Sequence, residues 1–347
     1  MPARPTAEIL STETARLFQQ AIERASQRLR AGEVVAIPTE TVYGLAANAL
    51  DAKAVSRIYE IKGRPASNPL IVHVADLAMA QRCVAAWPET ATCAAKAFWP
   101  GPLTLVLERS EAIPTIVTAG GPTVAIRWPS HPFAQQLIRA CGFPLAAPSA
   151  NRSNEVSPTN AEHVRKDLDG QVPLIVDGGQ SQVGIESTVL DLTVRPPRVL
   201  RPGIIHRESL AAVLGEVLAG PGNESRSKSP GLLSKHYSPR ARLAVCSWRN
   251  ETDLRKQLQE FGVAPASTRI LAHTRIPSDL EAGTISVIPH DPEAFARALY
   301  SELRRCDEEG ASLIVVEAVP DRSEWEGVAD RLHRAGGRAD RGGWITG

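Results

Sequence analysis

Two cations, an amide and a hydroxyl stand close together between Lys62 and Leu70, in the stretch Lys-Gly-Arg-Pro-Ala-Ser-Asn-Pro-Leu. One glycine and two prolines favour a loop here, between an apolar helix-like segment and an apolar run. A loop with two fixed cations at a strand edge suits a polyanion such as a nucleoside triphosphate. A solvated turn with ordinary surface charge explains these nine residues equally well, so the rest of the chain must decide.

Other polar clusters follow apolar, strand-like runs in the first half of the chain. The turn Pro38–Leu45 contains two threonines, Glu40 and Tyr43, and Arg127 ends the apolar run 123–127. An arginine at the end of a core strand is costly unless a carboxylate or phosphate binds it, and a structural ion pair would also satisfy it. His73 alone is more typical of a core histidine than of a ligand. Turn chemistry explains the other clusters about as well as a site does; they are Ser149-Ala150-Asn151, Gly184–Thr188 and Arg201-Pro202-Gly203.

Together these clusters predict one binding site. Polar groups that gather at strand ends of one sheet are typical of a ligand site. Cations in the clusters favour an anionic ligand, and the hydroxyls and amides favour a polar one. The cations are Lys62, Arg64, Arg127 and Arg201.

The elements that position these residues form two predicted domains. Helices are expected at 12–31, 51–61 (with Asp51 as N-cap), 76–86, 89–98, 131–141 and 206–218. Strands are expected at 33–37, 70–74, 103–107, 123–127, 173–176, 187–192 and 198–201. These elements lack a strict βαβ rhythm, which predicts an α/β domain over 1–218 with a twisted mixed sheet.

A linker is predicted at 219–240, because this segment is rich in Gly, Ser and Pro and poor in apolar residues. Beyond it, strands at 242–246, 268–273, 284–288 and 312–317 and helices at 251–261 and 292–306 alternate. The alternation predicts a smaller Rossmann-like α/β/α domain over 241–347. It lacks a G-x-G-x-x-G turn, so no dinucleotide is assigned to it.

Composition fits a two-domain protein of 347 residues, with 43% hydrophobic and 22% charged residues. The net charge of +1 indicates no global attraction to nucleic acid. Five scattered cysteines argue against a disulfide framework and a zinc site, and favour a reducing, cytoplasmic setting. We expect no metal site made by the protein alone, no signal peptide and no membrane span.

In this order the motifs closely resemble the YrdC/Sua5 family of threonylcarbamoyl-adenylate synthases. The resemblance rests on Pro38-Thr-Glu-Thr-Val-Tyr-Gly-Leu45, on Lys62-Gly-Arg64 with Asn68-Pro-Leu, on Ser149-Ala-Asn151 and on Glu186-Ser-Thr188. The segment Ser229–Pro239 resembles the signature that joins the two domains of Sua5-type members. The resemblance covers nearly the whole chain except Ala335–Gly347.

The resemblance implies a nucleotidyltransferase that joins L-threonine, bicarbonate and ATP into L-threonylcarbamoyl-AMP and pyrophosphate. The product supplies the t6A modification at position 37 of tRNA, through other proteins that perform the transfer. The implied partners are therefore the three substrates directly, and the transferase proteins and tRNA indirectly. Mg²⁺ would be bound mainly through ATP. Catalysis would rest on positioning and on neutralising phosphate charge, because the reactants supply nucleophile and electrophile.

Site residues follow from the resemblance, position by position. L-threonine would be bound by Thr41, His73, Arg127 and Ser187. ATP would be bound by Arg64, Asn68, Thr123, Ser149, Asn151, Arg201 and Tyr237. Lys62 and Arg64 would be the catalytic pair, with Lys62 on the phosphates. Two choices stay open, namely Tyr237 against its neighbour His236 and Thr41 against Thr39. If Tyr237 reaches the nucleotide, the linker would act as a lid over the site.

Two other functions compete with this interpretation. One is a non-catalytic RNA-binding module, which the near-neutral charge makes weaker because phosphate binding needs a local excess of Lys and Arg. The other is the related carbamoyl-transfer domain of hydrogenase maturation proteins. Those proteins carry an acylphosphatase-like domain and Cys-rich zinc motifs upstream, and this chain has no cysteine pairs.

Overall fold

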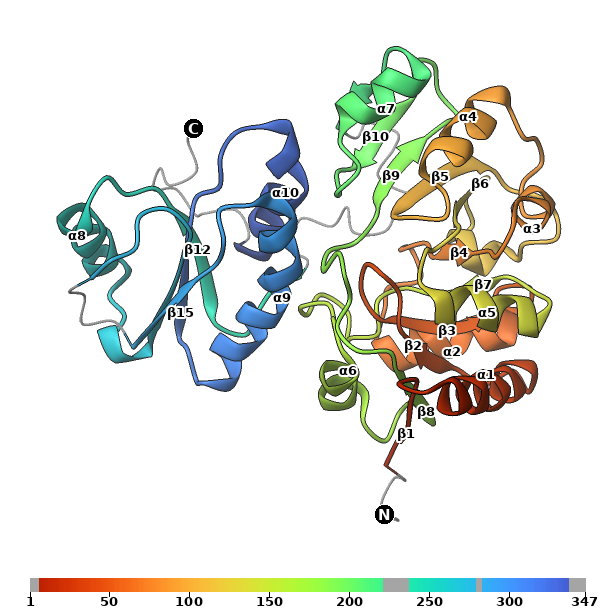
Figure 1. Ribbon diagram of the computed structural model, residues 1–347, viewed down its shortest axis with the longest axis horizontal. Coiled ribbons are helices and arrows are strands. Elements are labelled where there is room, and N and C mark those ends of the chain that lie inside the picture. The colour runs from red at the N-terminus through yellow and green to blue at the C-terminus, as the bar shows by residue number, and fades with distance from the viewer. Residues whose placement is uncertain (1–5, 221–236, 279–282, 337–347) are drawn as a thin grey trace. The chain divides into compact units, whose positions relative to one another are not determined.

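The computed structural model describes residues 6–220, 237–278 and 283–336 (Figure 1). The chain divides into two compact units. The first comprises Met1–Ser153 and Ser157–Leu232, and the second comprises Asn154–Val156 and Leu233–Gly347. Most of the predicted linker, and with it the proposed lid, lies outside the described residues.

The first unit contains a mixed sheet of eleven strands. Both parallel and antiparallel pairs occur, as predicted; β4 is parallel to β6, for example, and β5 is antiparallel to β6. In spatial order the strands are β1 (Glu8–Ser11), β8 (Leu174–Asp177), β2 (Val35–Ile37), β3 (Gly44–Asn48), β7 (Leu145–Ala146), β4 (Ile71–His73), β6 (Thr123–Arg127), β5 (Leu103–Glu108), β9 (Thr188–Asp191), β10 (Arg198–Arg201) and β11 (Leu218–Ala219).

Helices pack one apolar face each against this sheet and form the main core of the first unit. In Figure 1, α1 to α5 lie on the same side of the sheet. The helices are α1 (Ala15–Arg30), α2 (Ala52–Lys62), α3 (Leu77–Arg82), α4 (Glu89–Phe98), α5 (Pro132–Cys141), α6 (Ala161–Leu168) and α7 (Arg207–Leu214), with a 3₁₀ turn η1 (Thr115–Thr118).

Helix α2 shows how local sequence places the loop that follows it. Asp51 caps its N-terminus by accepting hydrogen bonds from the backbone N–H groups of Lys53 and Ala54, as predicted. Gly63 ends it in the left-handed conformation, with φ of 59°. The chain therefore turns sharply between Lys62 and Arg64, and both cations are buried at the end of the helix.

A second, smaller apolar cluster covers the other face of the central strands. Its members alternate along each strand with residues of the main core, as the two-residue period of a strand requires. They are Ile71, Val106, Ala125, Val189 and Leu200. We call this face of β4, β5, β6, β9 and β10 the site face, because the predicted site residues of these strands share it.

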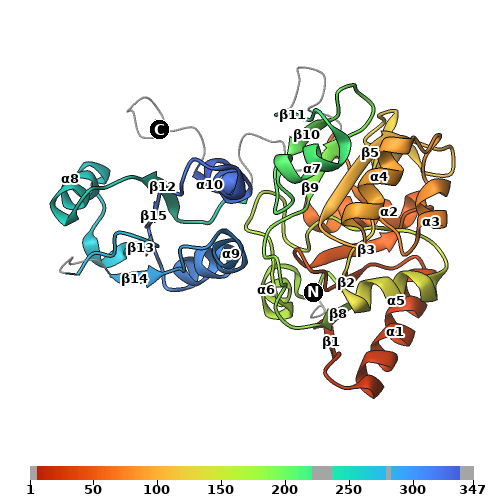
Figure 2. The ribbon, with the colours of Figure 1, turned by 45° about the horizontal axis from the view of Figure 1, so that its top comes forward.

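The second unit is a four-stranded parallel sheet with the order β12-β15-β13-β14. Helix α8 covers one face of it, and α9 and α10 cover the other (Figures 1 and 2). This is the predicted Rossmann-like arrangement. The elements are β12 (Arg242–Cys246), α8 (Glu251–Phe261), η2 (Pro265–Ser267), β13 (Thr268–Ala272), β14 (Thr284–Val287), α9 (Pro292–Glu308), β15 (Leu313–Glu317), η3 (Ser323–Trp325) and α10 (Glu326–Gly336).

The structure corrects the predicted elements in several places. Strands β1, β3 and β11 and helix α10 were not predicted from the sequence. The helix predicted at 206–218 ends at Leu214, because Gly215 has a φ of 82° and the chain then enters β11. Within the described residues, no helix is long and apolar enough to cross a membrane.

Candidate functional site

Arg127 and His73 lie side by side at the ends of neighbouring strands. Strands β4 and β6 are parallel, and their register pairs His73 with Arg127. Both residues are two positions from a member of the small apolar cluster, so both point to the site face. Each is buried, which brings an arginine and a histidine into the same desolvated place.

The loop between β2 and β3 supplies the partners of Arg127. Arg127 Nη2 lies 2.6 Å from Glu40 Oε1, and Arg127 Nη1 donates to Thr41 Oγ1 at 2.9 Å. Its Nε donates to the carbonyl oxygen of Gly101 at 3.2 Å. Thr39 Oγ1 instead donates to the carbonyl oxygen of Val42 at 2.6 Å. This geometry favours Thr41 over Thr39 as the hydroxyl beside Arg127.

Burial sets the protonation of this group. Burial and then the Arg127 guanidinium lower the pKa of His73 to about 3, so its ring is neutral near pH 7. Burial by itself raises the pKa of Glu40, but Arg127 and the backbone N–H of Ser130 outweigh it and hold that pKa below its usual value. The site therefore contains an ionised carboxylate, a guanidinium and a neutral imidazole, which we call the Arg127 cluster: Glu40, Thr41, His73 and Arg127.

Ser187 and Arg201 come together on the same face through a bulge in β10. Val199 pairs with Leu190 while Arg201 pairs with Val189, so one extra residue of β10 is accommodated between them. Directly opposed residues of an antiparallel pair share a face, and the bulge therefore turns Arg201 toward the site face. Arg201 Nη2 donates to Ser187 Oγ at 3.2 Å and to its carbonyl oxygen at 3.0 Å.

Close backbone approach holds this corner in place. Ser187 Oγ lies 2.7 Å from Thr104 Oγ1, which also points to the site face. A Cβ added at Gly203 would lie 2.5 Å from the backbone nitrogen of Thr188, so glycine is required for the turn after Arg201 to pack there. In the Arg-Pro-Gly motif, Arg201 thus supplies a positive charge, and Gly203 allows the close packing of the turn.

Lys62 ties two loops together. Its Nζ donates to the carbonyl oxygens of Ser149 and Asn151, both at 2.5 Å. An isolated bridge pairs Gly44 with Ser149, and the backbone nitrogen of Ala150 donates to the carbonyl oxygen of Tyr43 at 2.8 Å. The Ser149–Asn151 loop is therefore bonded on one side to α2 and on the other to the segment that follows Glu40 and Thr41.

Arg64 and Asn68 form a unit of their own directly before β4. Arg64 Nη2 donates to Asn68 Oδ1 at 2.6 Å and to the carbonyl oxygen of Pro69 at 2.7 Å. Asn68 is buried, and its Nδ2 has no hydrogen-bond partner among the residues that the structure describes. We call these residues, with those around Lys62, the Arg64 cluster: Lys62, Arg64, Asn68, Ser149 and Asn151.

Besides Arg201, two predicted ATP residues lie apart from this cluster. Thr123 begins β6 and shares the site face with Arg127, four residues along the strand. Tyr237 belongs to the second unit, where its buried ring stacks on Tyr300 with centroids 5.8 Å apart and lies 5.4 Å from the guanidinium carbon of Arg331. His236, its competitor, lies outside the described residues.

Sequence reasoning assigned no role to Glu40 or Thr104. Glu40 lies in the Pro38–Leu45 motif, but its partner Arg127 is distant in sequence, and no spacing rule relates the two. Thr104 sits inside an apolar strand pattern, and only the strand period could have marked it as facing the same way as Ser187. Among the described residues, no three His, Cys, Asp or Glu side chains come together in a way that could hold a metal ion.

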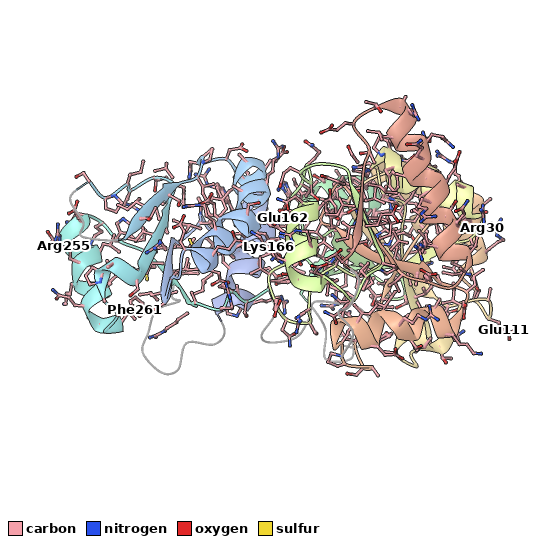
Figure 3. The ribbon with its side chains drawn as sticks, turned by 90° about the horizontal axis from the view of Figure 1, so that it is seen from below. Arg30, Glu111, Glu162, Lys166, Arg255 and Phe261 are labelled. Carbon is pink, nitrogen blue, oxygen red and sulfur yellow. The ribbon has the colours of Figure 1, made fainter. Side chains whose placement is uncertain are left out.

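Charged side chains outside the site are mixed in sign. Figure 3 labels Arg30 and Glu111 in the first unit, and Glu162 and Lys166 on α6. All four are exposed. The buried cations of the two clusters therefore stand out by their position and not through any excess of positive charge on the chain.

Comparison with known proteins relates both parts of the chain to one family. The Sua5/YciO/YrdC family model, described as telomere recombination, matches residues 27–203. A second model, described as the C-terminal domain of threonylcarbamoyl-AMP synthase, matches residues 205–337.

Relatives of similar length carry the same description. A threonylcarbamoyl-AMP synthase of Bacillus subtilis is 43% identical over 92% of this chain and 94% of its own length. One from Pyrococcus abyssi is 40% identical over 93% of this chain and 96% of its own length. A crystal structure of P. abyssi Sua5 complexed with L-threonine has a TM-score of 0.86 and 38% identity, and covers 95% of this chain and 98% of its own.

Proposed function

Because the chain belongs to the Sua5/YrdC family in its two-domain, Sua5-type form, we propose that L-threonine, bicarbonate and ATP react on the site face of its first unit. The enzyme synthesises L-threonylcarbamoyl-AMP, and its product serves the t6A modification of tRNA. The observation that carries the proposal for the site is the Arg127 cluster, in which four buried polar groups converge at the ends of β4 and β6 and in the loop after β2.

L-threonine binds at the Arg127 cluster in this proposal. Guanidinium groups pair with carboxylates in a fork geometry, and Arg127 is fixed on three sides by Glu40, Thr41 and Gly101. The neutral ring of His73 and the hydroxyl of Ser187 offer hydrogen bonds to the substrate hydroxyl or amine. A P. abyssi relative has been solved with L-threonine, which supports a threonine site in this fold.

ATP binds at the Arg64 cluster and at Arg201. Lys62 and Arg64 bring two buried positive charges to the end of α2, where a polyphosphate would neutralise them. The Nδ2 of Asn68, which has no partner among the residues described, and the loop Ser149–Asn151 supply neutral donors and acceptors. Arg201 contacts Ser187, and therefore stands where the nucleotide and threonine sites would meet. Thr123 and Tyr237 complete the proposed ATP set.

The chemistry needs no nucleophile from the protein. The amine of threonine attacks bicarbonate and water leaves, which gives a carbamate. A carbamate oxygen then attacks the α-phosphorus of ATP, and pyrophosphate departs. In this scheme the protein orients the reactants and balances the charge that develops on the phosphates, a role that we assign to Lys62 and Arg64.

We further propose that Mg²⁺ enters with the nucleotide. The residues of the Arg64 cluster are cations, hydroxyls and amides, and the carboxylate of Glu40 is paired with Arg127. Such a set fits a magnesium ion that takes most of its ligands from the phosphates. When bound, the ion would neutralise phosphate charge and help pyrophosphate leave.

Pyrophosphate release by the purified full-length chain tests the proposal. We expect release to require L-threonine, bicarbonate and ATP together, and to fall by at least about 10-fold in Lys62→Ala and in Arg64→Ala. Lys53→Ala, an exposed lysine of the same helix, is the matched control and keeps full activity. Release that is independent of threonine and bicarbonate, or unchanged activity in both variants, would contradict it.

A further inference from the structure

One carboxylate oxygen of Glu40 has no hydrogen-bond partner within the described part of the chain. Its Oε1 receives both contacts, from Arg127 Nη2 at 2.6 Å and from the backbone nitrogen of Ser130 at 3.1 Å. Its Oε2 is buried and has no hydrogen-bond partner among the residues that the structure describes. Burying a carboxylate oxygen without a donor is costly, so a ligand that supplies the donor would recover that free energy.

A second buried polar atom of the same cluster lacks a partner too. His73 Nδ1 has no hydrogen-bond partner among the described residues. The His73 ring interacts electrostatically with both Arg127 and Glu40. Both residues are more than nine-tenths buried, at 6% exposure for Glu40 and 4% for His73. Glu40 Oε2 and His73 Nδ1 lie in the same cluster as the guanidinium of Arg127. This arrangement suits a small molecule that carries both a carboxylate and a hydrogen-bond donor.

We propose that Glu40 Oε2 binds the α-ammonium group of threonine, while Arg127 binds its α-carboxylate. The inference rests on the proposed threonine site and deepens it, because it makes the site one for a zwitterion. Arg127 has five N–H groups, of which its contacts with Glu40, Thr41 and Gly101 use three, so it keeps donors for a second carboxylate. Glu40 therefore acts both on the substrate and on the position of Arg127.

Charge balance supports this assignment. The guanidinium of Arg127 and the carboxylate of Glu40 neutralise each other, and a zwitterion adds one charge of each sign. Each added charge then faces an opposite one, so binding leaves no net charge buried. A carboxylic acid without the amine would leave one uncompensated negative charge beside Glu40.

The test compares two ligands that differ only at the amino group. Binding of L-threonine and of (R)-3-hydroxybutanoate, in which hydrogen replaces the amine, is measured by calorimetry on the full-length chain with a chelator and no metal. We expect the wild type to prefer threonine by about 10- to 100-fold, the range for a hydrogen bond to a charged group. Glu40→Gln should reduce that preference to within a few-fold, and Glu40→Asp, which keeps the charge, should retain part of it.

The ratio of the affinities for the two ligands separates binding of the ammonium group by Glu40 from positioning of Arg127 by Glu40. A misplaced Arg127 would weaken the binding of both ligands equally and leave this ratio unchanged. Arg127→Lys should therefore weaken both and keep the preference, and Glu33→Gln, a surface carboxylate paired with Arg28, should change neither. An unchanged preference in Glu40→Gln would overturn the inference and leave the proposed site standing. An affinity for threonine that is unchanged in Arg127→Lys would instead contradict the proposed threonine site.

A measurement on the wild type alone keeps the inference testable if the Glu40 variants do not fold. Raising the pH above the pKa of the free amine removes the ammonium charge of threonine and leaves the deamino analogue unchanged. We expect the preference for threonine to shrink over that range. A preference that stays constant across it would overturn the inference.

Discussion

At the scale of single residues, the site depends on buried charges that balance one another. Glu40 and Arg127 are ionised and in contact, and His73 beside them is neutral. Each of these states follows from burial and from the nearest charge, so each can be tested by titration or by substitution.

His73 should make the first unit less stable in mild acid. Its pKa is near 6.5 in the unfolded chain and about 3 when folded, so between these values only the unfolded state binds the proton. Stability therefore falls as the pH drops, by about 2 kcal/mol between pH 7 and pH 5. Glu40 adds to this loss of stability only at lower pH. Its carboxylate has a lowered pKa in the folded state, so the stability that it contributes is lost only as the pH falls below about 4.5.

The variant His73→Gln should lose this share of the acid sensitivity, since glutamine does not titrate. Urea unfolding at both pH values, read by hydrogen exchange of peptides from β4 and β6, measures it within the first unit. An equal loss of stability in wild type and variant would show that His73 is not held neutral by the fold.

Serine should be a weak substrate. It lacks only the methyl group of threonine, and one methyl in an apolar contact is worth roughly 1–3 kcal/mol, so we expect kcat/KM for serine to be about 10- to 200-fold lower. Valine keeps the shape but lacks the hydroxyl, and should be rejected more strongly. Steady-state kinetics with the three amino acids measures this, and equal turnover of serine and threonine would contradict it.

Arg127 could be picked out from the sequence as a candidate site residue, and its partner could not. Arg127 ends an apolar strand, and that pattern alone demands a carboxylate or a phosphate. Its carboxylate turned out to be Glu40, in a loop before it in sequence. Only the sheet order brings the two together, and a single sequence does not contain that order.

At the scale of elements, strand β3 was not predicted because its local sequence does not favour a strand. Its sequence Gly-Leu-Ala-Ala-Asn contains no β-branched residue and begins with a glycine, so propensity favours a loop. It forms a strand because it lies between β2 and β7 and is buried against them. The strand matters for the site, because Gly44 at its start pairs with Ser149.

The bulge in β10 is the element on which Arg201 depends, and Gly203 keeps its turn in place. We expect Gly203→Ala to force the turn away from Thr188 and Ser187, to cost about 1–3 kcal/mol of stability and to weaken substrate binding at least several-fold. Gly142→Ala, at the open left-handed end of α5, should cost about 1 kcal/mol without changing binding. Chemical denaturation and calorimetry measure both effects; binding that is weakened alike in both variants would contradict the role of the turn.

At the scale of the whole molecule, a short piece of the first half of the chain belongs to the second unit. Residues Asn154–Val156 separate the two stretches of the first unit. The backbone nitrogen of Ser238 donates to the carbonyl oxygen of Asn154 at 2.9 Å, and Arg304 donates to the carbonyl oxygen of Val156. This segment directly follows the Ser149–Asn151 loop and Ser153, whose backbone nitrogen donates to the carbonyl oxygen of Lys62.

Removal of the residues after 220 should therefore affect the two substrates differently. The truncated chain keeps the sheet and the Arg127 cluster, so we expect it to fold and to bind threonine within a few-fold of the full-length affinity. It loses the partners of Asn154–Val156, and with them support for the loop proposed to bind ATP, so synthesis should fall sharply. Circular dichroism and calorimetry check folding and binding. Unchanged synthesis by the truncated chain would show that the second unit does not act on the site.

A crossed binding experiment tests whether threonine binds at the Arg127 cluster and ATP at the Arg64 cluster. Calorimetry measures the affinities of L-threonine and of ATP for wild type, Arg127→Gln and Arg64→Gln. We predict that Arg127→Gln weakens threonine binding by at least about 10-fold and changes ATP binding by no more than a few-fold, and that Arg64→Gln does the reverse. The opposite pattern, or equal losses for both ligands in both variants, would contradict it.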